Sequence, residues 1–380
     1  MNASQSGRAV YDLAIVGAGI LGLAAALAAA RAGKRVVVID RDARANGASV
    51  RNFGFITVTG QQRGECWGRA MRSRDVWADV APKADIRIEH AGLAVVARRP
   101  EARDVLAAFA ASEMGAACEL LDGTTARRRF PELSQKLEAV LYSPHDLRVE
   151  SRDAIPKLAA YLERLGVTFM RETSVSRVAP PTVTTSRGEV AAGSAIVCAG
   201  DDFTTLFARR LTPYRLLRCK VQMLRVAPGR GCRLSCAVMS DLSLVRYLGY
   251  AEMPQAQTLR RRLEAEQAEH LAHGIHLIAV GSNDGTMVVG DSHDYATTPD
   301  PFVDDHVEGL MLDEYRAVFG HTPAIVQRWF GTYAWAPDRL ALVDAPAEDV
   351  RIAIVTSGTG ASTGFAIGEE IVRDLLGVAP

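Results

Sequence analysis

The sequence predicts an α/β protein in which a parallel sheet domain is joined to a second, α+β domain built on a mostly antiparallel sheet. A strand, glycine turn and helix stand near the N-terminus, and a second set of the same kind stands at the C-terminus. Between them lie apolar runs with the two-residue alternation of strands. With 380 residues the chain exceeds the usual size of a single core, so two packed domains are expected.

The N-terminal segment carries a dinucleotide-binding pattern in the order that a Rossmann-like fold requires. A β-rich run leads into G-x-G-x-x-G, an alanine-rich helix and a second strand that ends in an acid. These parts are residues 13–16, the glycines Gly17, Gly19 and Gly22, residues 23–32, residues 35–39 and Asp40. The alternative is a structural βαβ unit without a ligand, which leaves the glycine spacing unexplained.

Each glycine of this pattern has a physical role. Gly17 permits a tight turn after the strand, Gly19 lets backbone N–H groups approach a pyrophosphate, and Gly22 lets helix and strand pack closely. The pyrophosphate is then expected at the positive end of the helix. Asp40 follows Gly22 by 18 residues, close to the about 20 expected for the acid that binds a ribose hydroxyl.

Composition excludes several classes of function. The 44 basic and 44 acidic residues cancel, which argues against a nucleic-acid or anionic-membrane partner. The six cysteines form no C-x-x-C pair, so we expect no metal site and free thiols in a reducing cytoplasm. Residues 13–30 are apolar enough for a membrane span or signal sequence. Their spaced glycines and the lack of a basic flank instead indicate a cytoplasmic protein without a targeting segment.

The remaining elements are predicted from periodicity and turn residues. Expected helices are 63–80, 101–114, 152–165, 257–270, 304–319 and 365–376, and expected strands are 91–97, 167–171, 172–178, 195–200, 216–226, 243–250, 276–280, 286–290 and 351–355. Residues 282–285 join two of these strands in a β-hairpin. Residues 127–129 are predicted as an arginine-rich, solvated turn, and residues 144–146 as another turn.

Two polar or glycine-rich loops are candidates for ligand contact. Residues 41–54 follow the nucleotide-binding unit directly, so Ser49, Arg51 and Asn52 are placed to touch a cofactor or what lies beyond it. The alternative is an ordinary connecting loop. Residues 356–364 form a second glycine-rich loop between a strand and a helix. A cofactor longer than a mononucleotide is therefore expected between the two glycine loops.

Taken together, these motifs resemble the FAD-dependent amine oxidoreductases related to glycine, sarcosine and D-amino-acid oxidases. The resemblance rests on G-A-G-I-L-G with Asp40-Arg41, on G-A-S-x-R-N at 47–52, on C-A-G at 198–200 and on S-G-T-G at 357–360. It implies FAD as cofactor. The implied FAD-binding residues are Gly17, Gly19, Ile20, Leu21, Gly22, Asp40, Arg41, Ser49, Asn52, Val175, Ala199, Gly200, Gly358, Thr359 and Gly360. The flavin-tethering cysteine of sarcosine-oxidase-like members falls near Gly331, which implies noncovalent FAD.

A narrower resemblance concerns the substrate. The runs 49–55 and 244–250 are most similar to a branch associated with bacterial phosphonate breakdown. This implies oxidative deamination of 2-aminoethylphosphonate or its N-methyl form to phosphonoacetaldehyde, ammonia or methylamine, and hydrogen peroxide. Tyr333 stands where glycine-oxidase-like enzymes carry an arginine for the substrate carboxylate, and a phenol does not replace that charge. An α-amino acid is therefore disfavoured.

A phosphonate requires guanidinium, N–H and O–H donors. The predicted substrate-binding residues are Arg51, Asn52, Arg246 and Tyr247, and the predicted catalytic or pocket-shaping residues are Tyr250, Tyr333 and Trp335. On strand 243–250, alternation places Arg246 and Tyr250 on one face and Tyr247 on the other. The alternatives are a solvated Arg246, an Arg51 that binds FAD phosphate, and core aromatics at 333 and 335. Lys220 is a candidate for oxygen activation, although solvation at a sheet edge is the favoured alternative. His293 is a candidate for a role in the site, although a surface position is favoured.

The predicted FAD-binding domain is discontinuous and comprises residues 9–90, 140–215 and 325–380; the predicted substrate domain comprises 91–139 and 216–324. The expected partners are a small-molecule amine and molecular oxygen, and a homodimer is left open. The amides of residues 358–364 are candidates to stabilise anionic reduced flavin. Three alternatives stay open: an oxidase of another small amine or amino acid, a dehydrogenase with a different acceptor, and a flavin-binding protein without catalysis.

Overall fold

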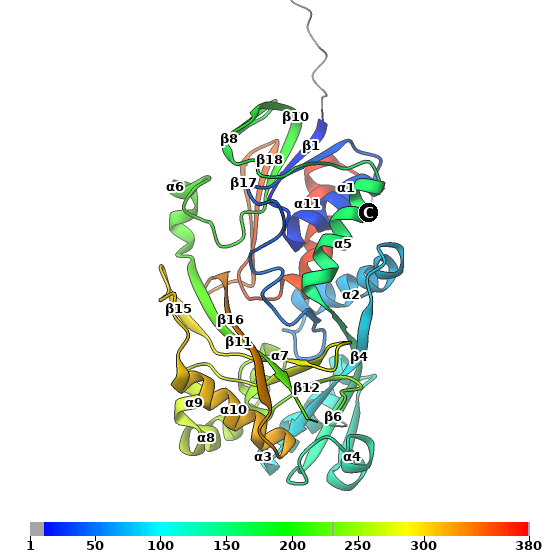
Figure 1. Cartoon of the computed structure of the whole chain (residues 1–380), viewed down its shortest axis with the longest axis vertical. Coiled ribbons are helices and arrows are strands. Elements are labelled where there is room, and N and C mark those ends of the chain that lie inside the picture. Colours follow the sequence, from blue (N-terminus) through cyan, green and yellow to red (C-terminus); the bar gives the residue numbers. More distant parts are fainter. Residues whose placement is uncertain (1–10, 230–231, 379–380) are drawn as a thin grey trace, which may run out of the picture.

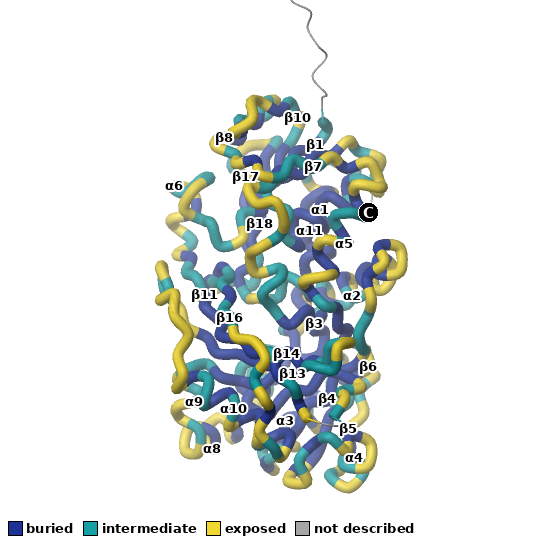
Figure 2. Tube along the Cα trace, viewed as in Figure 1, coloured by how far each residue is buried: buried dark blue, intermediate teal, exposed yellow. Residues whose placement is uncertain are grey.

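The computed structural model describes residues 11–229 and 232–378 and shows a mixed α/β fold arranged around two sheets. In Figure 1 the first sheet lies in the upper half and the second in the lower half. Buried residues run continuously through the interior of both halves, whereas exposed residues are concentrated at the loops and outer helices (Figure 2). Positions 9–10 and 379–380 of the predicted FAD-binding domain and 230–231 of the predicted substrate domain lie outside the described residues.

The first sheet has the strand order β17-β18-β10-β1-β2-β7. Its parallel strands are β1 (Tyr11–Val16), β2 (Val36–Ile39), β7 (Thr168–Met170), β10 (Gly188–Val197) and β18 (Val350–Val355), and β17 (Ala341–Ala347) is antiparallel to β18. The predicted return of the chain into this sheet near residue 195 is confirmed, because β10 pairs with both β1 and β18.

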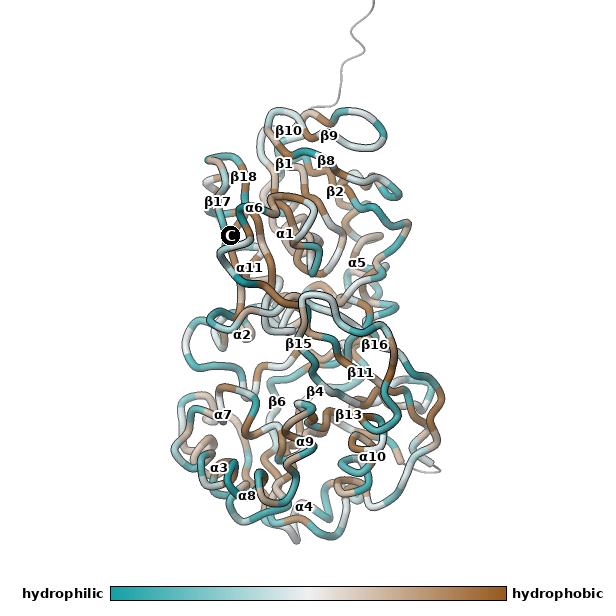
Figure 3. The backbone as a smooth tube through the Cα atoms, turned by 90° about the vertical axis from the view of Figure 1, so that its left-hand side faces the viewer, coloured by the Kyte–Doolittle hydropathy of each residue, from teal (hydrophilic) through white to brown (hydrophobic). Residues whose placement is uncertain are grey.

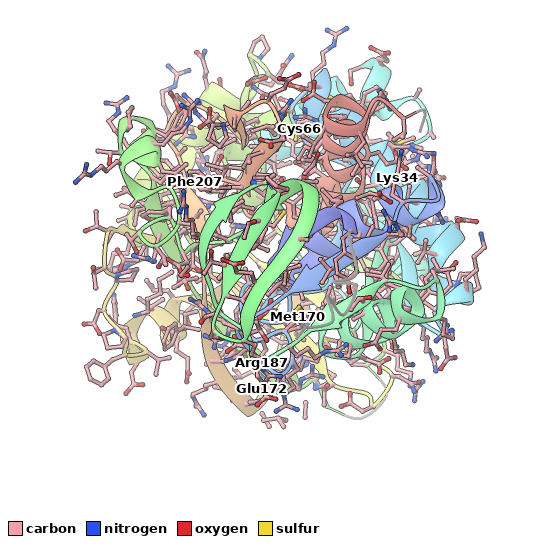
Figure 4. The ribbon with its side chains drawn as sticks, turned by 90° about the horizontal axis from the view of Figure 1, so that it is seen from above. Lys34, Cys66, Met170, Glu172, Arg187 and Phe207 are labelled. Atoms are coloured by element: carbon pink, nitrogen blue, oxygen red, sulfur yellow. The ribbon has the colours of Figure 1, made fainter. Side chains whose placement is uncertain are left out.

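Alternate residues of β1 face two different layers, as expected for a strand buried on both faces. Leu13 and Ile15 pack against the helices, whereas Ala14 packs on the opposite side. The helices are α1 (Ile20–Arg31), α2 (Glu65–Lys83), α5 (Ser151–Arg164) and α11 (Gly360–Leu376). The hairpin β8 (Val175–Ala179) and β9 (Thr182–Thr185) extends β10 at the end of the molecule farthest from the second sheet (Figures 1 and 4).

The second sheet has the order β15-β11-β14-β13-β12-β4-β6-β3, with β16 on β11 and β5 on β6. Its strands are β3 (Phe55–Ile56), β4 (Ile88–Ala97), β5 (Glu119–Asp122), β6 (Ala139–Val149), β11 (Leu217–Ala227), β12 (Ala237–Met239), β13 (Ile278–Gly281), β14 (Met287–Gly290), β15 (Asp294–Ala296) and β16 (Ala324–Trp335). Among the described strands of this second sheet, only β4 and β12 pair in parallel. The predicted mostly antiparallel sheet is therefore confirmed.

Short and peripheral helices complete the second half. They are α3 (Pro100–Ala110), α4 (Gly123–Arg129), α7 (Leu248–Ala251), α8 (Ala256–Glu266), α9 (Ala268–Ala272) and α10 (Asp305–Phe319), with α6 (Ala208–Leu211) between the halves. In the side view of Figure 3, α8 is mostly hydrophilic and α1 mostly hydrophobic. This contrast fits the outer position of α8 and the central position of α1.

The predicted domain boundaries remain a prediction, but three strands on the FAD-domain side of them, β3, β6 and β16, pair in the second sheet. β6 pairs with β4, and β16 pairs with β11 along its whole length. The sequence of β16 reads as a return toward the C-terminal glycine loop. The strand makes this return while it remains hydrogen-bonded to β11, so one element connects the two halves.

The prediction of a strand at 243–250 is wrong. The segment forms a 3-10 helix (Asp241–Val245) followed by α7, with Tyr247 N–H donating to Ser243 O and Ala251 N–H donating to Tyr247 O. All residues of the 3-10 helix are buried. Since both sides of the 3-10 helix are buried, apolar and polar residues do not mark an inner and an outer face. The alternation of residues in this segment was therefore no evidence for a strand.

The turn predicted at 144–146 is also wrong, because β6 continues through it. Asp146 is fully buried, and its carboxylate accepts hydrogen bonds from the N–H groups of Val58 and Thr59 and from the Thr59 hydroxyl. A distant segment therefore satisfies the polar group that suggested a turn. Similarly, residues 127–129 end helix α4, where Asp122 accepts the N-terminal hydrogen bond from Thr125 N–H.

Two helices begin earlier than predicted. α1 starts at Ile20 and α11 at Gly360, so both glycine-rich sequences provide the first helical turn as well as the preceding loop. The hairpin of β13 and β14 is confirmed. Its turn is closed by two hydrogen bonds of ordinary length: Gly285 N–H donates to Ser282 O at 3.0 Å, and Ser282 N–H donates to Thr286 O at 2.9 Å. Helix α10 is confirmed, with Asp304 as its N-cap.

Candidate active site

A cavity of about 660 Å³ lies between the two sheets. Its walls come from segments that are far apart in the sequence: the start of α1, the loop at 48–62, β11, the segment 246–248, the residues around β14, and the chain from Gly331 to Ser362. Both glycine-rich loops therefore meet at one cavity. The end formed by these loops is called the glycine end, and the end that contains Arg246 and Asp291 is called the charged end.

The turn between β1 and α1 depends on its glycines. Gly17 has φ +104°, and a Cβ there would lie 2.3 Å from the Cys198 carbonyl oxygen. A Cβ on Gly22 would lie 1.9 Å from the Gly17 carbonyl oxygen. Real Cβ atoms do not approach other atoms so closely, so both side chains are excluded. The predicted roles of Gly17 in the tight turn and of Gly22 in close packing agree with this geometry.

The first turn of α1 is suited to an anionic ligand. Leu21 and Gly22 line the cavity and belong to the helix start, where amide groups have no partner within the helix. No acidic residue stands in this described turn. The Ser49 hydroxyl accepts the Ile20 N–H at 2.9 Å and fixes the loop at 48–52 beside the helix start. A pyrophosphate at this position would receive amide hydrogen bonds and the favourable helix dipole.

The C-terminal glycine loop reaches the same place through helix packing. A Cβ on Gly368 of α11 would lie 2.7 Å from the Ala25 nitrogen of α1, so the two helices touch at their backbones. Gly358 has φ +73°, and a Cβ there would lie 3.0 Å from the Tyr333 ring. The N-termini of α1 and α11 thus both line the cavity, and a phenol covers the second loop.

The structure brings most of the predicted cofactor-binding residues to the cavity. Those that line it are Gly19, Ile20, Leu21, Gly22, Ser49, Asn52, Gly200, Gly358, Thr359 and Gly360. Gly17, Asp40, Arg41, Val175 and Ala199 are not among the described residues that line it. Contacts of these five with FAD stay predictions.

Asp40 and Arg41 have protein partners in the structure. Asp40 accepts the Ala18 N–H at 2.6 Å and the Asp42 N–H at 2.8 Å, so its carboxylate stabilises the glycine turn. Arg41 forms an exposed ion pair with Asp202 at 2.8 Å. Asp40 therefore supports the binding loop from behind, whether or not it also contacts a ribose.

At the charged end, Arg246 is the principal cation. It lines the cavity, and its Nη2 donates to the Tyr295 hydroxyl at 3.0 Å. Burial alone would lower the pKa of Arg246, but the nearby Tyr295 and Tyr333 oxygens and Asp291 raise it, so the guanidinium stays charged. No ion pair joins it to a carboxylate among the described residues. The predicted alternative of a solvated strand residue is not supported, since Arg246 is neither on a strand nor fully exposed.

Aromatic side chains surround this guanidinium. The rings of Tyr295 and Trp335 are 4.7 Å apart, and Tyr333 lies against the C-terminal glycine loop. Burial raises the pKa of Tyr333 well above its ordinary value, and burial also raises the pKa of Tyr295, so both phenols remain O–H donors at neutral pH. Tyr333 and Trp335 are therefore cavity residues, in agreement with the prediction that they shape the pocket.

The other predicted substrate residues are divided between the cavity and the core. Arg51, Asn52 and Tyr247 line the cavity, but the Asn52 side chain shapes its own loop by donating to Ala48 O at 2.6 Å. Tyr250 is fully buried against Phe109, with ring centroids 4.6 Å apart. It lies outside the described cavity lining, because the helical turn at 248–251 directs it into the core. The prediction of a catalytic Tyr250 therefore lacks support.

Sequence reasoning missed a polar cluster at the charged end. His276, Asp291 and His293 are buried, line the cavity and offer ligand atoms that lie within 4.8 Å of one another. His293 was considered with a surface position favoured, and the structure places it inside instead. The signal was its tetrapeptide Gly-Asp-Ser-His, in which Asp291 stands two residues before His293. His276 had no local signal, because it comes from the neighbouring strand of the hairpin.

Lys220 does not reach the cavity, and the predicted solvation at a sheet edge is wrong. Its side chain is largely buried and its Nζ donates to the Phe302 carbonyl oxygen. Lys220 is absent from the described residues that line the cavity. The arrangement indicates a role in holding the loop before α10.

The cavity fits an extended dinucleotide. Its glycine end offers two helix N-termini and excludes side chains where backbone must approach the ligand, whereas its other end carries aromatic and charged groups. The fold and site thus define a protein that binds an extended dinucleotide between a Rossmann-like domain and a cap. Within the described residues, no helix combines the length and apolar character that a membrane span requires.

Comparison with known proteins identifies the family. Residues 12–373 match the DAO family model, described as FAD dependent oxidoreductase, so the chain belongs to this family. It is therefore an FAD-dependent oxidoreductase. No curated protein sequence matches the chain significantly.

Solved structures share the fold over nearly the whole chain. Glycine oxidase from Geobacillus kaustophilus has a TM-score of 0.78 and 18% identity, covering 98% of this chain and 96% of that chain. L-proline dehydrogenase from P. horikoshii has a TM-score of 0.76 and 18% identity, covering 95% and 92%. L-alpha-glycerophosphate oxidase from Mycoplasma pneumoniae, with FAD bound, has a TM-score of 0.76 and 15% identity, covering 97% and 95%. At these identities the similarity concerns the fold alone.

Proposed function

We propose that this protein is an FAD-dependent oxidase of a small aminophosphonate, either 2-aminoethylphosphonate or its N-methyl form. The products would be phosphonoacetaldehyde, ammonia or methylamine, and hydrogen peroxide. The observation that carries the proposal is the charged guanidinium of Arg246, which lines the cavity without a carboxylate partner among the described residues. Such a cation favours a ligand with an acidic group.

The groups around Arg246 suit a phosphonate better than a carboxylate. A phosphonate has three oxygens that accept hydrogen bonds, and guanidinium with several O–H donors satisfies them. Tyr295 already contacts Arg246, and Tyr333 is a neutral phenol on the same cavity wall. A carboxylate has two oxygens and pairs best with a second N–H fork, which the position of Tyr333 does not provide.

When bound, FAD would supply the two-electron oxidation of the carbon next to the amine, and water would hydrolyse the resulting imine. The contribution of the chain is to hold the substrate in the productive orientation. Arg246 and its phenol neighbours would bind the acidic group, and Trp335 and Tyr247 would cover the apolar carbons and exclude water. The amides at the start of α11 stand beside Gly358, where they would favour negative charge on the reduced cofactor.

We propose that FAD is bound without a covalent link. Gly331 lines the cavity where the tethering cysteine of sarcosine-oxidase-like members was expected. Burial raises the pKa of the Cys198 and Cys219 thiols to about 12, so neither is present as the reactive thiolate. All six cysteines are free, which supports a reducing, cytoplasmic location.

A small amino acid is the second candidate substrate, because Arg246 would also pair with a carboxylate. Iminodiacetate oxidase from Chelativorans sp. BNC1 shares the fold at a TM-score of 0.72 and 17% identity, covering 97% of this chain and 96% of that chain. Its named substrate carries an amine and two acids. This candidate differs from the first in the shape of the acidic group and not in the presence of an amine.

The test is to mix purified protein with 2-aminoethylphosphonate, its N-methyl derivative, sarcosine and glycine without oxygen, and to follow the loss of flavin absorbance. We expect the fastest reduction with one of the two phosphonates, and peroxide when air is admitted. Faster reduction by sarcosine or glycine would overturn the substrate. Reduction without peroxide in air would instead indicate a dehydrogenase, and no reduction by any amine would indicate a flavin protein without this catalysis.

A further inference from the structure

We propose that the Asp291 carboxylate, held between His276 and His293, receives the ammonium group of the substrate. The site is the part of the charged end that contains these three side chains. This inference rests on the proposed function, because it concerns the second charged group of the same substrate. It adds an amine-binding residue to the acid-binding residue Arg246.

The imidazole rings of His276 and His293 flank the Asp291 carboxylate, and each ring lies nearest to a different oxygen. The Nε2 atom of His276 lies 3.1 Å from Oδ1, and the Nε2 atom of His293 lies 3.7 Å from Oδ2. The imidazole rings are stacked with centroids 5.4 Å apart. Their far nitrogens have other partners: His293 Nδ1 lies 2.9 Å from the Gly274 carbonyl oxygen, and His276 Nδ1 lies 3.2 Å from the Ser243 hydroxyl.

The partner of His293 determines where its proton resides. A carbonyl oxygen only accepts hydrogen bonds, so His293 Nδ1 must carry the proton that it donates to Gly274. Burial lowers the pKa of His293 to about 3, so the ring is neutral and its Nε2 has a lone pair. That lone pair faces the Asp291 carboxylate, which is itself an acceptor. His293 therefore provides no hydrogen bond to Asp291.

Asp291 is consequently short of donors. Its Oδ1 has no hydrogen-bond partner assigned among the described residues, and His276 Nε2, at 3.1 Å, is its one imidazole neighbour. Only 7% of Asp291 is exposed, and the residue lines the cavity. A buried carboxylate without donors is strongly unfavourable. The lone pair of His293 Nε2 and the carboxylate oxygens of Asp291 together favour a positive group with N–H donors at this place.

Asp291 is present as the anion. Burial alone raises its pKa, but the neighbouring His276 and Arg246 lower it, and the net shift is downward. A carboxyl group with a lowered pKa is a weak base. Asp291 is therefore suited to bind and orient an ammonium group, and the proton that this group must lose before the carbon gives up a hydride passes to water.

Among the described residues, neither Arg246 nor Asp291 has a permanently charged partner of opposite sign. Arg246 forms no ion pair with Asp291, and each lines the same cavity. A ligand with one anionic and one cationic group would satisfy both, which a simple amine or a simple acid would not. The geometry thus points to a zwitterion as the substrate class, with its acid at Arg246 and its nitrogen at Asp291.

A divalent metal ion is the other source of positive charge that two imidazoles and a carboxylate accept. The two sources are separated by experiment. Wild-type holoenzyme is analysed for bound metal by mass spectrometry. We expect less than about one-tenth of an equivalent, and flavin reduction unchanged by EDTA. A stoichiometric metal that is lost in Asp291→Asn would overturn the proposal.

The binding test compares a ligand with an amine to one without it. In stopped-flow reduction, Asp291→Asn is expected to raise the Kd of 2-aminoethylphosphonate by about tenfold or more, because one charge-assisted contact is lost. The Kd of ethylphosphonate, measured from the flavin spectrum, should change less than about twofold. Asp344→Asn is the matched control, since Asp344 pairs with Arg210 outside the described cavity lining. It should change neither value.

Equal weakening of both ligands in Asp291→Asn, or no weakening of 2-aminoethylphosphonate, would overturn the role of Asp291. Retained flavin and an unchanged far-UV spectrum show that the variant has folded. If only sarcosine or glycine reduces the wild-type flavin, the proposed function fails by itself. The same comparison is then made with glycine against acetate, and a selective loss of glycine affinity would still support Asp291 as the amine site.

Discussion

The glycine end and the charged end of the cavity use different parts of the polypeptide. At the glycine end, binding groups are backbone amides at two helix starts, and glycines keep side chains away from them. At the charged end, binding groups are side chains, above all Arg246, which lies just before α7, and Asp291, which follows β14. One end is built from backbone geometry and the other from side-chain chemistry.

This difference explains how one fold serves related reactions. Amide groups at a helix start bind phosphate whatever side chains are nearby. Binding at the glycine end therefore depends on the direction of the backbone N–H groups and on the absence of side chains in front of them. The charged end recognises its ligand through charge and hydrogen-bond count, which single substitutions alter. Substitutions at the glycine end should therefore abolish cofactor binding, whereas substitutions at the charged end should change substrate affinity with FAD retained.

The largest effect is expected for Gly22→Ala. The new Cβ would lie 1.9 Å from the Gly17 carbonyl oxygen, so the turn and helix must separate. We expect FAD affinity to fall by about 100-fold or more, roughly 2.8 kcal/mol, measured by flavin fluorescence in equilibrium dialysis. Gly309→Ala is the control, because nothing lies within 4 Å of that Cβ and alanine favours the helix α10. Unchanged FAD affinity in Gly22→Ala would contradict the role of close packing.

Arg246→Lys tests whether the charged end needs a fork of donors or only a positive charge. Lysine keeps the charge but loses the planar donor pair and the geometry of the Tyr295 contact. We expect kcat/KM for the best phosphonate to fall by about 20-fold or more, roughly 1.8 kcal/mol, with FAD content unchanged. The surface residue Arg328, paired with Glu308, provides the control Arg328→Lys. A variant with wild-type kcat/KM would remove Arg246 from substrate binding.

Tyr295→Phe sharpens the same point with a smaller change. The phenol of Tyr295 accepts from Arg246 at 3.0 Å, and the substitution removes that hydrogen bond while the ring stays beside Trp335. We expect KM to rise by about fivefold, about 1 kcal/mol, from steady-state peroxide production. Tyr161→Phe, on α5 in the first half, is the matched control and should leave KM at the wild-type value. A fall in FAD content instead of a rise in KM would contradict the separation of the two ends.

The smallest effect concerns His90, a half-buried histidine of the second half that lies outside the described cavity lining. Burial, with a further contribution from Arg148, lowers the pKa of His90 to about 3, and its Nε2 accepts the Gly281 N–H. Because the folded-state pKa lies below the unfolded value, the unfolded chain takes up the proton first as the pH falls. The stabilising contribution of neutral His90 is therefore fully present above the pKa that His90 has in the unfolded chain, and it is lost as the pH falls below that value.

From pH 7.5 to 6.0, His90 is expected to account for about 0.8 kcal/mol of the loss in unfolding free energy. His90→Gln removes this titration and keeps an acceptor for Gly281, so its urea-unfolding free energy should fall by that much less over the same range. FAD affinity should be the same as in the wild type. An equal fall in both proteins would show that His90 is protonated in the folded state.

The sequence by itself determined the FAD-binding half to a large extent. The spacing of Gly17, Gly19 and Gly22, the second glycine loop near residue 358 and the strand at 195–200 are local patterns, and each forms the predicted structure. The reason is that a glycine turn followed by a helix creates its binding site within one stretch of chain. Arg246, Tyr333 and Trp335 were also found, through residue type and a family resemblance.

Only the tertiary structure decided the charged end. His276 stands just before β13 and Asp291 just after β14, and their meeting with Arg246 depends on sheet pairing that no local pattern contains. Two wrong or unsupported predictions have the same cause. Tyr250 was predicted to be catalytic and Asp146 to lie in a turn, but segments distant in the chain bury both side chains. Backbone-built sites are encoded locally, whereas side-chain sites depend on long-range packing, and this is the physical limit of prediction for this protein.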